Sequence, residues 1–194
     1  MRRYLATTTL PLCAILLMQI GGRSFAQEQV HKYVDDKFDF SITVSPPWKE
    51  ARLQDYAVPG VARTAYAQPG GASIVVFVQE PGQAFDSRFL VDESAKSIEA
   101  NLGAKVREKD VRPVGGKQAM WLIVEGNGTG GAIDGKGAVT TTQHWVAVPR
   151  QKDVVVALLT SPTSDFEERK KSFEKAIQTL VVGGSQTTAQ AESK

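Results

Sequence analysis

Cysteine is almost absent from this sequence. Its one cysteine, Cys13, lies in an apolar N-terminal stretch that we expect export to remove, so the mature chain has none. A chain without cysteine forms no disulfide, offers no thiolate nucleophile and holds no cysteine-ligated zinc. Lipidation at Cys13 is not expected either, because Leu12 stands where a lipobox has a small residue. The fold must therefore rest on its hydrophobic core.

A long hydrophobic run is lacking after the first 26 residues. Residues 1–26 have the layout of a secretory signal peptide, in which Arg2 and Arg3 precede the apolar stretch 10–20 and a small-x-small site ends at Ala26. We predict cleavage after Ala26 and a secreted or periplasmic protein without stable membrane insertion. The alternative is an uncleaved anchor. The length argues against it, because the apolar stretch is shorter than the roughly 20 residues of a membrane-spanning helix.

Neither sign of charge dominates the mature chain. Without residues 1–26, 20 of the 23 basic side chains remain against 21 acidic ones. A nearly neutral chain without a basic run gives no electrostatic reason to expect nucleic acid or an anionic membrane as a partner. Its length is that of one ordinary domain, which we place at residues 27–184. Residues 185–194 are small and polar, and we expect a disordered tail there.

Residues that ligate metals are few and scattered. The two histidines, His31 and His144, are far apart, and neither has a histidine or carboxylate at helical metal-ligand spacing. The acidic pair Asp35 and Asp36 lacks the further carboxylates of a calcium cage, so we interpret it as a solvated entrance to the first strand. We therefore expect no metal site, and we expect His144 to be a hydrogen-bonded or exposed strand residue beside Trp145.

The common catalytic motifs are missing as well. No serine has glycines at both flanking offsets of a G-x-S-x-G elbow, which argues against a serine hydrolase. Residues 127–137 have five glycines in eleven positions, but they lack the Lys-Ser/Thr pair and the following helix of a phosphate-binding loop. We interpret them as a flexible loop that begins with a formal glycosylation acceptor, Asn127-Gly128-Thr129. No catalytic residue and no cofactor follow from the sequence.

What the sequence does contain is alternation of apolar and polar side chains. In KFDFSITVSPPW, residues 37–48, four apolar side chains share one face of an extended chain: Phe38, Phe40, Ile42 and Val44. This pattern predicts a half-buried antiparallel strand, preceded by a polar leader over residues 27–36. Pro46 and Pro47 cannot donate to a β-ladder and end the strand, and we expect the indole of Trp48 to cover the edge of the core.

Three further pairs of extended runs predict hairpins, because turn-forming residues separate the two members of each pair. The pairs are 62–67 with 73–79, 104–112 with 117–125, and 138–148 with 154–160. The continuously apolar run 74–78 is typical of a central strand that is covered on both faces. Together these runs predict a largely antiparallel sheet of about six to seven strands.

Two amphipathic helices are predicted to cover this sheet. The segment 87–102 has apolar residues at helical spacing and is followed by Gly103. The segment 164–182 begins with a capping box formed by Ser164 and Glu167. Its apolar face consists of Phe166, Phe173, Ile177 and Leu180. The predicted fold class is therefore α+β, with an antiparallel sheet sandwiched between helices.

Between residues 33 and 182 this order of elements resembles the PsbP-like α/β/α sandwich, including the DcrB-type secreted proteins of bacteria. The local markers are FDFSITVSPPW, VRPVGGKQAMWLIVEG and SDFEERKKSFEKAIQTL. Known relatives of this fold include an extrinsic photosystem subunit, a Ran-GTPase-binding import factor and bacterial envelope proteins of undefined role. The resemblance implies the binding of a protein partner, and it carries over no catalytic residue.

The sequence leaves two functions open. The first is a secreted or periplasmic, non-enzymatic binding or accessory protein of the cell envelope, with a protein partner. The alternative is an enzyme with an unrecognised pocket on the sheet. For the first we expect a recognition edge formed by the glycine-rich loop and nearby strand residues, namely Asn127, Thr129, Asp134, Lys136, His144 and Trp145. Long irregular connections in compact domains are often functional, which is the reason for this choice.

Overall fold

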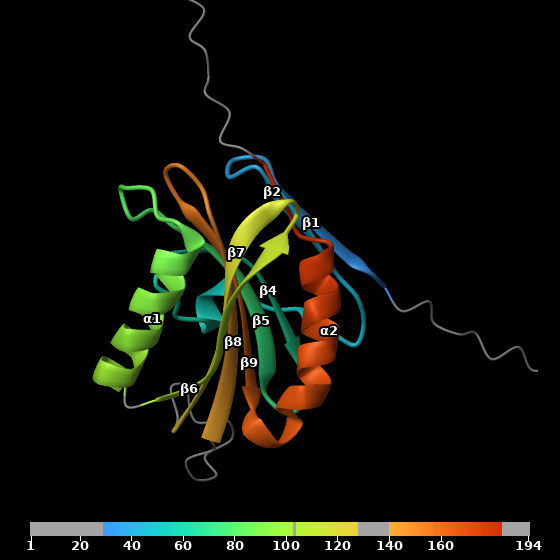
Figure 1. Cartoon of the computed structure of the whole chain (residues 1–194). Coiled ribbons are helices and arrows are strands. Elements are labelled where there is room, and N and C mark those ends of the chain that lie inside the picture. The colour runs from blue at the N-terminus through green and yellow to red at the C-terminus, as the bar shows by residue number, and fades with distance from the viewer. Residues whose placement is uncertain (1–28, 103, 128–139, 184–194) are drawn as a thin grey trace, which may run out of the picture.

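The computed structural model describes residues 29–102, 104–127 and 140–183 (Figure 1). The predicted signal peptide and the predicted tail lie outside the described residues. Neither helix in the described part of the chain is long and apolar enough to cross a membrane.

The centre of the fold is a seven-stranded antiparallel sheet with the strand order β3-β4-β5-β9-β8-β7-β6. Its strands are β3 (Lys49–Glu50), β4 (Val61–Gln68), β5 (Ala72–Gln79), β6 (Lys105–Val114), β7 (Lys117–Asn127), β8 (Thr140–Pro149) and β9 (Val154–Pro162). The three predicted hairpins are confirmed, since β4 pairs with β5, β6 with β7 and β8 with β9. The α+β class predicted from the sequence is also confirmed.

A second, three-stranded sheet contains the strand with which the sequence pattern begins. Its order is β1 (His31–Asp35), β2 (Phe40–Val44) and β10 (Val181–Val182). The alternation in β2 is confirmed, because its side chains are buried and half-buried in turn. The prediction of a polar leader is wrong for residues 31–35, which pair with β2 along the whole strand. In that segment the inward positions are taken by polar or amphipathic side chains, so the apolar pattern is weak.

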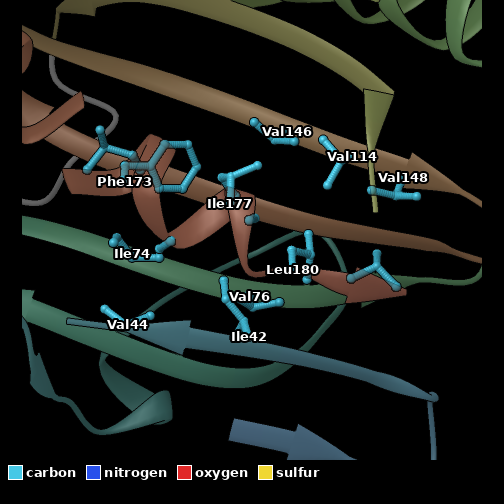
Figure 2. Packing of buried hydrophobic residues seen from close by; sticks show 14 of the residues in the cluster. Ile42, Val44, Ile74, Val76, Val114, Val146, Val148, Phe173, Ile177 and Leu180 are labelled. Atoms are coloured by element: carbon cyan, nitrogen blue, oxygen red, sulfur yellow. The ribbon is translucent and has the colours of Figure 1, made fainter. Parts of the chain in front are cut away.

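The molecule has three layers. Figure 1 shows α1 (Ser87–Leu102) on one face of the seven-stranded sheet and α2 (Phe166–Gln178) on the other, where the three-stranded sheet lies beside it. Each interface has its own cluster of buried apolar side chains. The larger one brings together side chains of β2, β5 and α2, among them Ile42, Ile74 and Phe173 (Figure 2). Strand β5 contributes to both clusters, as expected of a strand covered on both faces.

The first helix begins and ends where the sequence predicts. The Oδ1 atom of Asp86 accepts a hydrogen bond of 2.8 Å from the backbone N–H of Phe89 and so caps the first turn.

The second helix is shorter than predicted, and its predicted capping box is wrong. A 3₁₀ turn, Thr163–Asp165, precedes it, so Asp165 is the N-cap residue and makes no side-chain capping bond. Ser164 Oγ donates to Asp165 Oδ1 instead. After Gln178 the chain leaves the helix, and residues 181 and 182 form β10 because the edge of β2 offers them backbone partners. The predicted apolar face is buried throughout.

Trp48 connects the strands to helix α2. Its side chain is 1% exposed, and its Nε1–H donates a hydrogen bond of 3.0 Å to Ser172 Oγ on α2. The indole therefore lies within the core and not only at its edge.

Candidate functional site

The turns of the fold gather at one end of the sheet and surround a pocket of about 710 Å³. The β1–β2 turn, the β8–β9 turn and the end of β10 form its wall, and Glu80 follows β5 at its rim. We call it the turn-end pocket. Its lining includes several charged side chains, namely Asp35, Asp36, Lys37, Asp39, Glu80, Arg150, Lys152 and Asp153. Only those charges that have no partner within the protein are available to a ligand.

Asp35 is buried and fully engaged by the protein itself. Its Oδ2 accepts hydrogen bonds from Arg63 Nε at 2.5 Å and from the Tyr33 hydroxyl at 2.9 Å, while Oδ1 accepts one from the backbone N–H of Phe38 at 3.0 Å. Burial raises the pKa of the Asp35 carboxyl, but these hydrogen bonds and the charge of Arg63 outweigh it and leave the pKa below its usual range. Asp35 is therefore a fixed carboxylate that shapes the β1–β2 turn.

Arg150 and Asp153 form a second buried ion pair across the β8–β9 turn. The guanidinium donates to both carboxylate oxygens, with distances of 2.5 Å from Nε to Oδ1 and 2.7 Å from the second nitrogen to Oδ2. It also donates to the backbone carbonyl of Phe38 at 2.5 Å. Such bidentate pairs are geometrically specific. Arg150 thereby joins the β8–β9 turn to the β1–β2 turn and holds the pocket wall together.

The last wall of the pocket depends on a close approach between two backbones. Asp39 has a φ of 45°, and its carbonyl accepts a hydrogen bond of 2.9 Å from the N–H of Gly183. A Cβ atom at Gly183 would lie 1.8 Å from Asp39 Oδ2, so glycine allows the chain after β10 to pass here. The three buried charges of the pocket, Asp35, Arg150 and Asp153, are thus bound by the protein itself, and the exposed ones, Asp36, Lys37, Asp39, Glu80 and Lys152, remain on the rim.

A second concavity lies beside α1, on the face of the seven-stranded sheet that this helix covers. This α1 groove has a volume of about 300 Å³ and is lined by Glu93, Ser94, Ser97 and Ile98 of α1 and by Met120, Leu122 and Trp145 of the sheet. Trp145 is half-buried. Its ring packs edge-on against Phe77, with centroids 6.1 Å apart, and its Nε1–H donates to Gln143 Oε1 at 3.1 Å. The indole is held in one orientation with part of its face open.

His144 does not belong to this surface. The sequence analysis placed it on one edge with Trp145, but neighbouring residues of a strand point to opposite faces. The imidazole is 1% exposed and lies among Trp121, Phe166 and Phe173 beneath α2. Burial, assisted by the positive charges of Lys170 and Arg112, lowers its pKa to about 3. In this structure His144 cannot contact a partner.

The other expected site residues are only partly described. Asn127 is the last residue of β7 and pairs with Thr140 at the end of the sheet away from the turn-end pocket. Thr129, Asp134 and Lys136 lie outside the described residues. The structure thus places Trp145 at the surface and His144 in the core. Within the described ranges, no three histidine or acidic side chains are arranged to hold a metal ion.

Sequence reasoning missed the residues that build the turn-end pocket. Asp35 was interpreted as solvated because its partner, Arg63, is 28 residues away. A signal for the other pair was present, since Arg150 and Asp153 flank a short turn between two apolar strands and are close enough in sequence to meet.

Known protein structures share this architecture. Searches of protein-family models and of curated proteins found no match. Among solved structures, cyanobacterial PsbP (CyanoP) from Synechocystis sp. PCC 6803 has a TM-score of 0.55 at 13% identity, covering 86% of this chain and 99% of its own. The chain has the PsbP-like fold. This confirms the resemblance found in the sequence, and such low identity shows the fold alone.

Two other proteins with a similar fold have known cellular roles. LpqN, involved in cell envelope biogenesis of Mycobacterium tuberculosis, has a TM-score of 0.53 at 13% identity, covering 80% of this chain and 91% of its own. The Ran-binding protein Mog1p of Saccharomyces cerevisiae has a TM-score of 0.50 at 12% identity, covering 81% and 97%. The fold is therefore found in proteins with different cellular roles.

Proposed function

We propose that this is a secreted or periplasmic, non-enzymatic binding or accessory protein of the cell envelope, and that it contacts a protein partner through the α1 groove. The observation that carries this proposal is the half-buried indole of Trp145, which lies in a concavity between α1 and the sheet. Tryptophan is enriched at protein interfaces, where a rigid indole supplies contact area at little entropic cost. A groove of this size accommodates one or two side chains of a partner.

The role of the fold in other proteins supports the same choice. LpqN is involved in cell envelope biogenesis, and Mog1p binds Ran. We propose the same role for the remaining members of the expected recognition edge, Asn127, Thr129, Asp134 and Lys136, which belong to the end of β7 and to the connection that follows it in the sequence.

Site-specific photo-crosslinking tests this proposal. A photoreactive phenylalanine analogue is placed at Trp145 or, as a control, at Phe89 of α1, whose side chain is 49% exposed. Each variant is exported in its native host and irradiated, and adducts are identified by mass. We expect one protein to be crosslinked from position 145 and not from position 89. Equal adducts from both positions, or none from position 145, contradict the proposal.

A specific observation favours an enzyme as the alternative, because the turn-end pocket is large enough for a small molecule. Against it, Asp35 and Arg150 already have partners within the protein. A screen of metabolites by thermal shift separates the two functions. A ligand whose stabilisation is lost in Lys37→Ala or Lys152→Ala, together with turnover of that ligand, favours the enzyme.

A further inference from the structure

Strand β1 is an open edge. It is the outermost strand of the three-stranded sheet, and in the described part of the chain no strand pairs with its other side. Figure 1 shows it at the periphery of the molecule, next to β2. An unpaired strand edge presents a row of backbone N–H and C=O groups to any extended chain that approaches it.

The two edge strands of the seven-stranded sheet are shorter or less regular than β1. Strand β3 is only two residues long. Strand β6 has an irregular register between Val106 and Glu108, contains Pro113, and carries charges of both signs along its length. Very short strands, bulges and prolines are among the usual means of keeping an edge unpaired. Strand β1 has a regular register with β2 and no proline.

The outward face of the small sheet carries two exposed valines. Val34 of β1 and Val181 of β10 both pair with Ser41 of β2, so the three residues form one row across the sheet. Val34 is 54% exposed and Val181 is 59% exposed. A strand added beside β1 would cover Val34, while Val181 would stay two strands away.

Charges on either side of Val34 are arranged for a strand of identical sequence. Lys32 lies two residues before Val34 in β1, and Asp36, in the turn that follows β1, lies two residues after it; both side chains are exposed. If two copies of β1 pair in antiparallel fashion about Val34, each Lys32 comes opposite the other copy's Asp36, just past the end of the strand. Opposite charges at directly facing positions stabilise a pair of strands, and parallel pairing would place like charges together.

We infer that β1 is a self-association edge, on which a second copy of this chain adds its own β1 in antiparallel orientation around a two-fold axis at Val34. The two small sheets then join into one six-stranded sheet. The contact is isologous, so it closes at the dimer and leaves no free β1 edge. The α1 groove lies on another face of the molecule, so dimer formation through β1 is independent of the proposed function.

Disulfide trapping tests the geometry. In the full chain carrying Cys13→Ala, Val34→Cys is compared with Val181→Cys under a glutathione redox buffer. A disulfide needs Cβ atoms about 3.5–4.5 Å apart, which residues facing each other at the axis can reach. The two Val181 positions would be five strand spacings apart, or roughly 24 Å. We expect a disulfide-linked dimer from Val34→Cys, at least about tenfold more than from the equally exposed control.

Sedimentation equilibrium tests the charges without a crosslink. In the chain with native Val34, Lys32→Asp or Asp36→Lys replaces two attractive pairs by two repulsive ones, and each is expected to raise the dimer Kd about tenfold. The double variant restores unlike pairs and should restore the dimer.

Three results would overturn the inference. The first is a native chain that remains monomeric at about 0.5 mM, a concentration at which even a weak dimer is populated. The second is equal crosslinking of the two cysteine variants. The third is a Val34→Cys chain that forms mixed disulfides only with another envelope protein, which would assign the edge to a foreign strand.

Discussion

The imidazole of His144 lies 5.2 Å from the ring of Phe173, measured between ring centroids, and 5.3 Å from the indole of Trp121. Its Nδ1 atom has no hydrogen-bond partner among the described residues. A charged imidazolium here would lack both water and a counterion, which is the physical reason for its low pKa of about 3. The packing of α2 on the sheet therefore requires His144 to be neutral.

Acidification should weaken the fold through His144. Unfolding returns the imidazole to a pKa near 6.5, so between about pH 6.5 and 3 the unfolded chain binds one more proton than the folded chain. This stability is fully present above pH 6.5 and decreases as the pH falls, by at most about 1.4 kcal/mol per pH unit. Denaturant unfolding of the wild type and of His144→Phe, at pH 4.5 to 7.5, measures it. We expect a flatter pH dependence in the variant.

The comparison variant for this experiment is His31→Asn, which removes the other histidine and leaves His144 in place. The lowest pH is set at 4.5 because the carboxyl of Asp35, with its lowered pKa, loses its stabilising contribution only at more acidic pH. Identical slopes for the wild type and His144→Phe would show that His144 can be protonated without unfolding α2 from the sheet.

Phe173 should contribute far more to stability than the residue at the start of its helix. Its ring is 0% exposed, so Phe173→Ala is expected to cost about 3 to 5 kcal/mol of unfolding free energy. Ser164→Ala should cost less than about 0.5 kcal/mol, because its hydroxyl bonds the Asp165 side chain and caps no backbone N–H. Chemical denaturation measures both. A loss near 1 kcal/mol for Ser164→Ala would mean that the hydroxyl caps the helix in solution.

The ion pair between Arg150 and Asp153 should show strong coupling. Asp153→Asn leaves a guanidinium that is 3% exposed without its counter-charge, and the expected cost is roughly 3 kcal/mol. Arg150→Met alone leaves the Asp153 carboxylate without its counter-charge and also removes the hydrogen bond to the Phe38 carbonyl. The double variant should lose less than the sum of the two single losses, which a double-mutant cycle of unfolding free energies determines. Additive losses would mean that the two turns are held together by other contacts.

Much of the fold could be predicted because its strands and helices have strong local patterns. The alternation from Phe38 to Val44 and the apolar run of β5 indicate the two strands around which the larger core is built. Strand β1 was missed because its inward positions are the polar or amphipathic His31, Tyr33 and Asp35. Tyr33 bonds Asp35, while His31 and Asp35 find partners in the distant Glu50 and Arg63. No periodicity in the sequence indicates such contacts.

The site was harder to predict than the fold for a similar reason. The turn-end pocket is assembled from turns that are far apart in the sequence and meet only when the sheets are packed, as the bond from Arg150 to the carbonyl of Phe38 illustrates. The separation of His144 from Trp145, in contrast, follows from the two-residue period of a strand and could have been predicted. Assigning both residues to one edge ignored that period.

The long connection between β7 and β8 provides the last test of the proposed recognition surface. Asn127 and Thr140 are paired, so a two-residue Asn-Gly turn between them can close the hairpin in place of residues 128–139. A shorter loop has less conformational entropy to lose on folding, and we expect a gain in stability of about 1 kcal/mol. If Thr129, Asp134 and Lys136 contact the partner, crosslinking from position 145 should decrease in the same variant.

A second variant separates the length of this connection from its side chains. It replaces residues 128–139 by twelve glycine and serine residues, which keeps the length while removing Thr129, Asp134 and Lys136. If the side chains are recognised, this variant should lose crosslinking without gaining stability, because its loop entropy is at least as high as that of the native chain. If both variants crosslink the partner as well as the wild type does, the connection is only a spacer. The partner is then held by the α1 groove alone, and Trp145→Ala should abolish its capture.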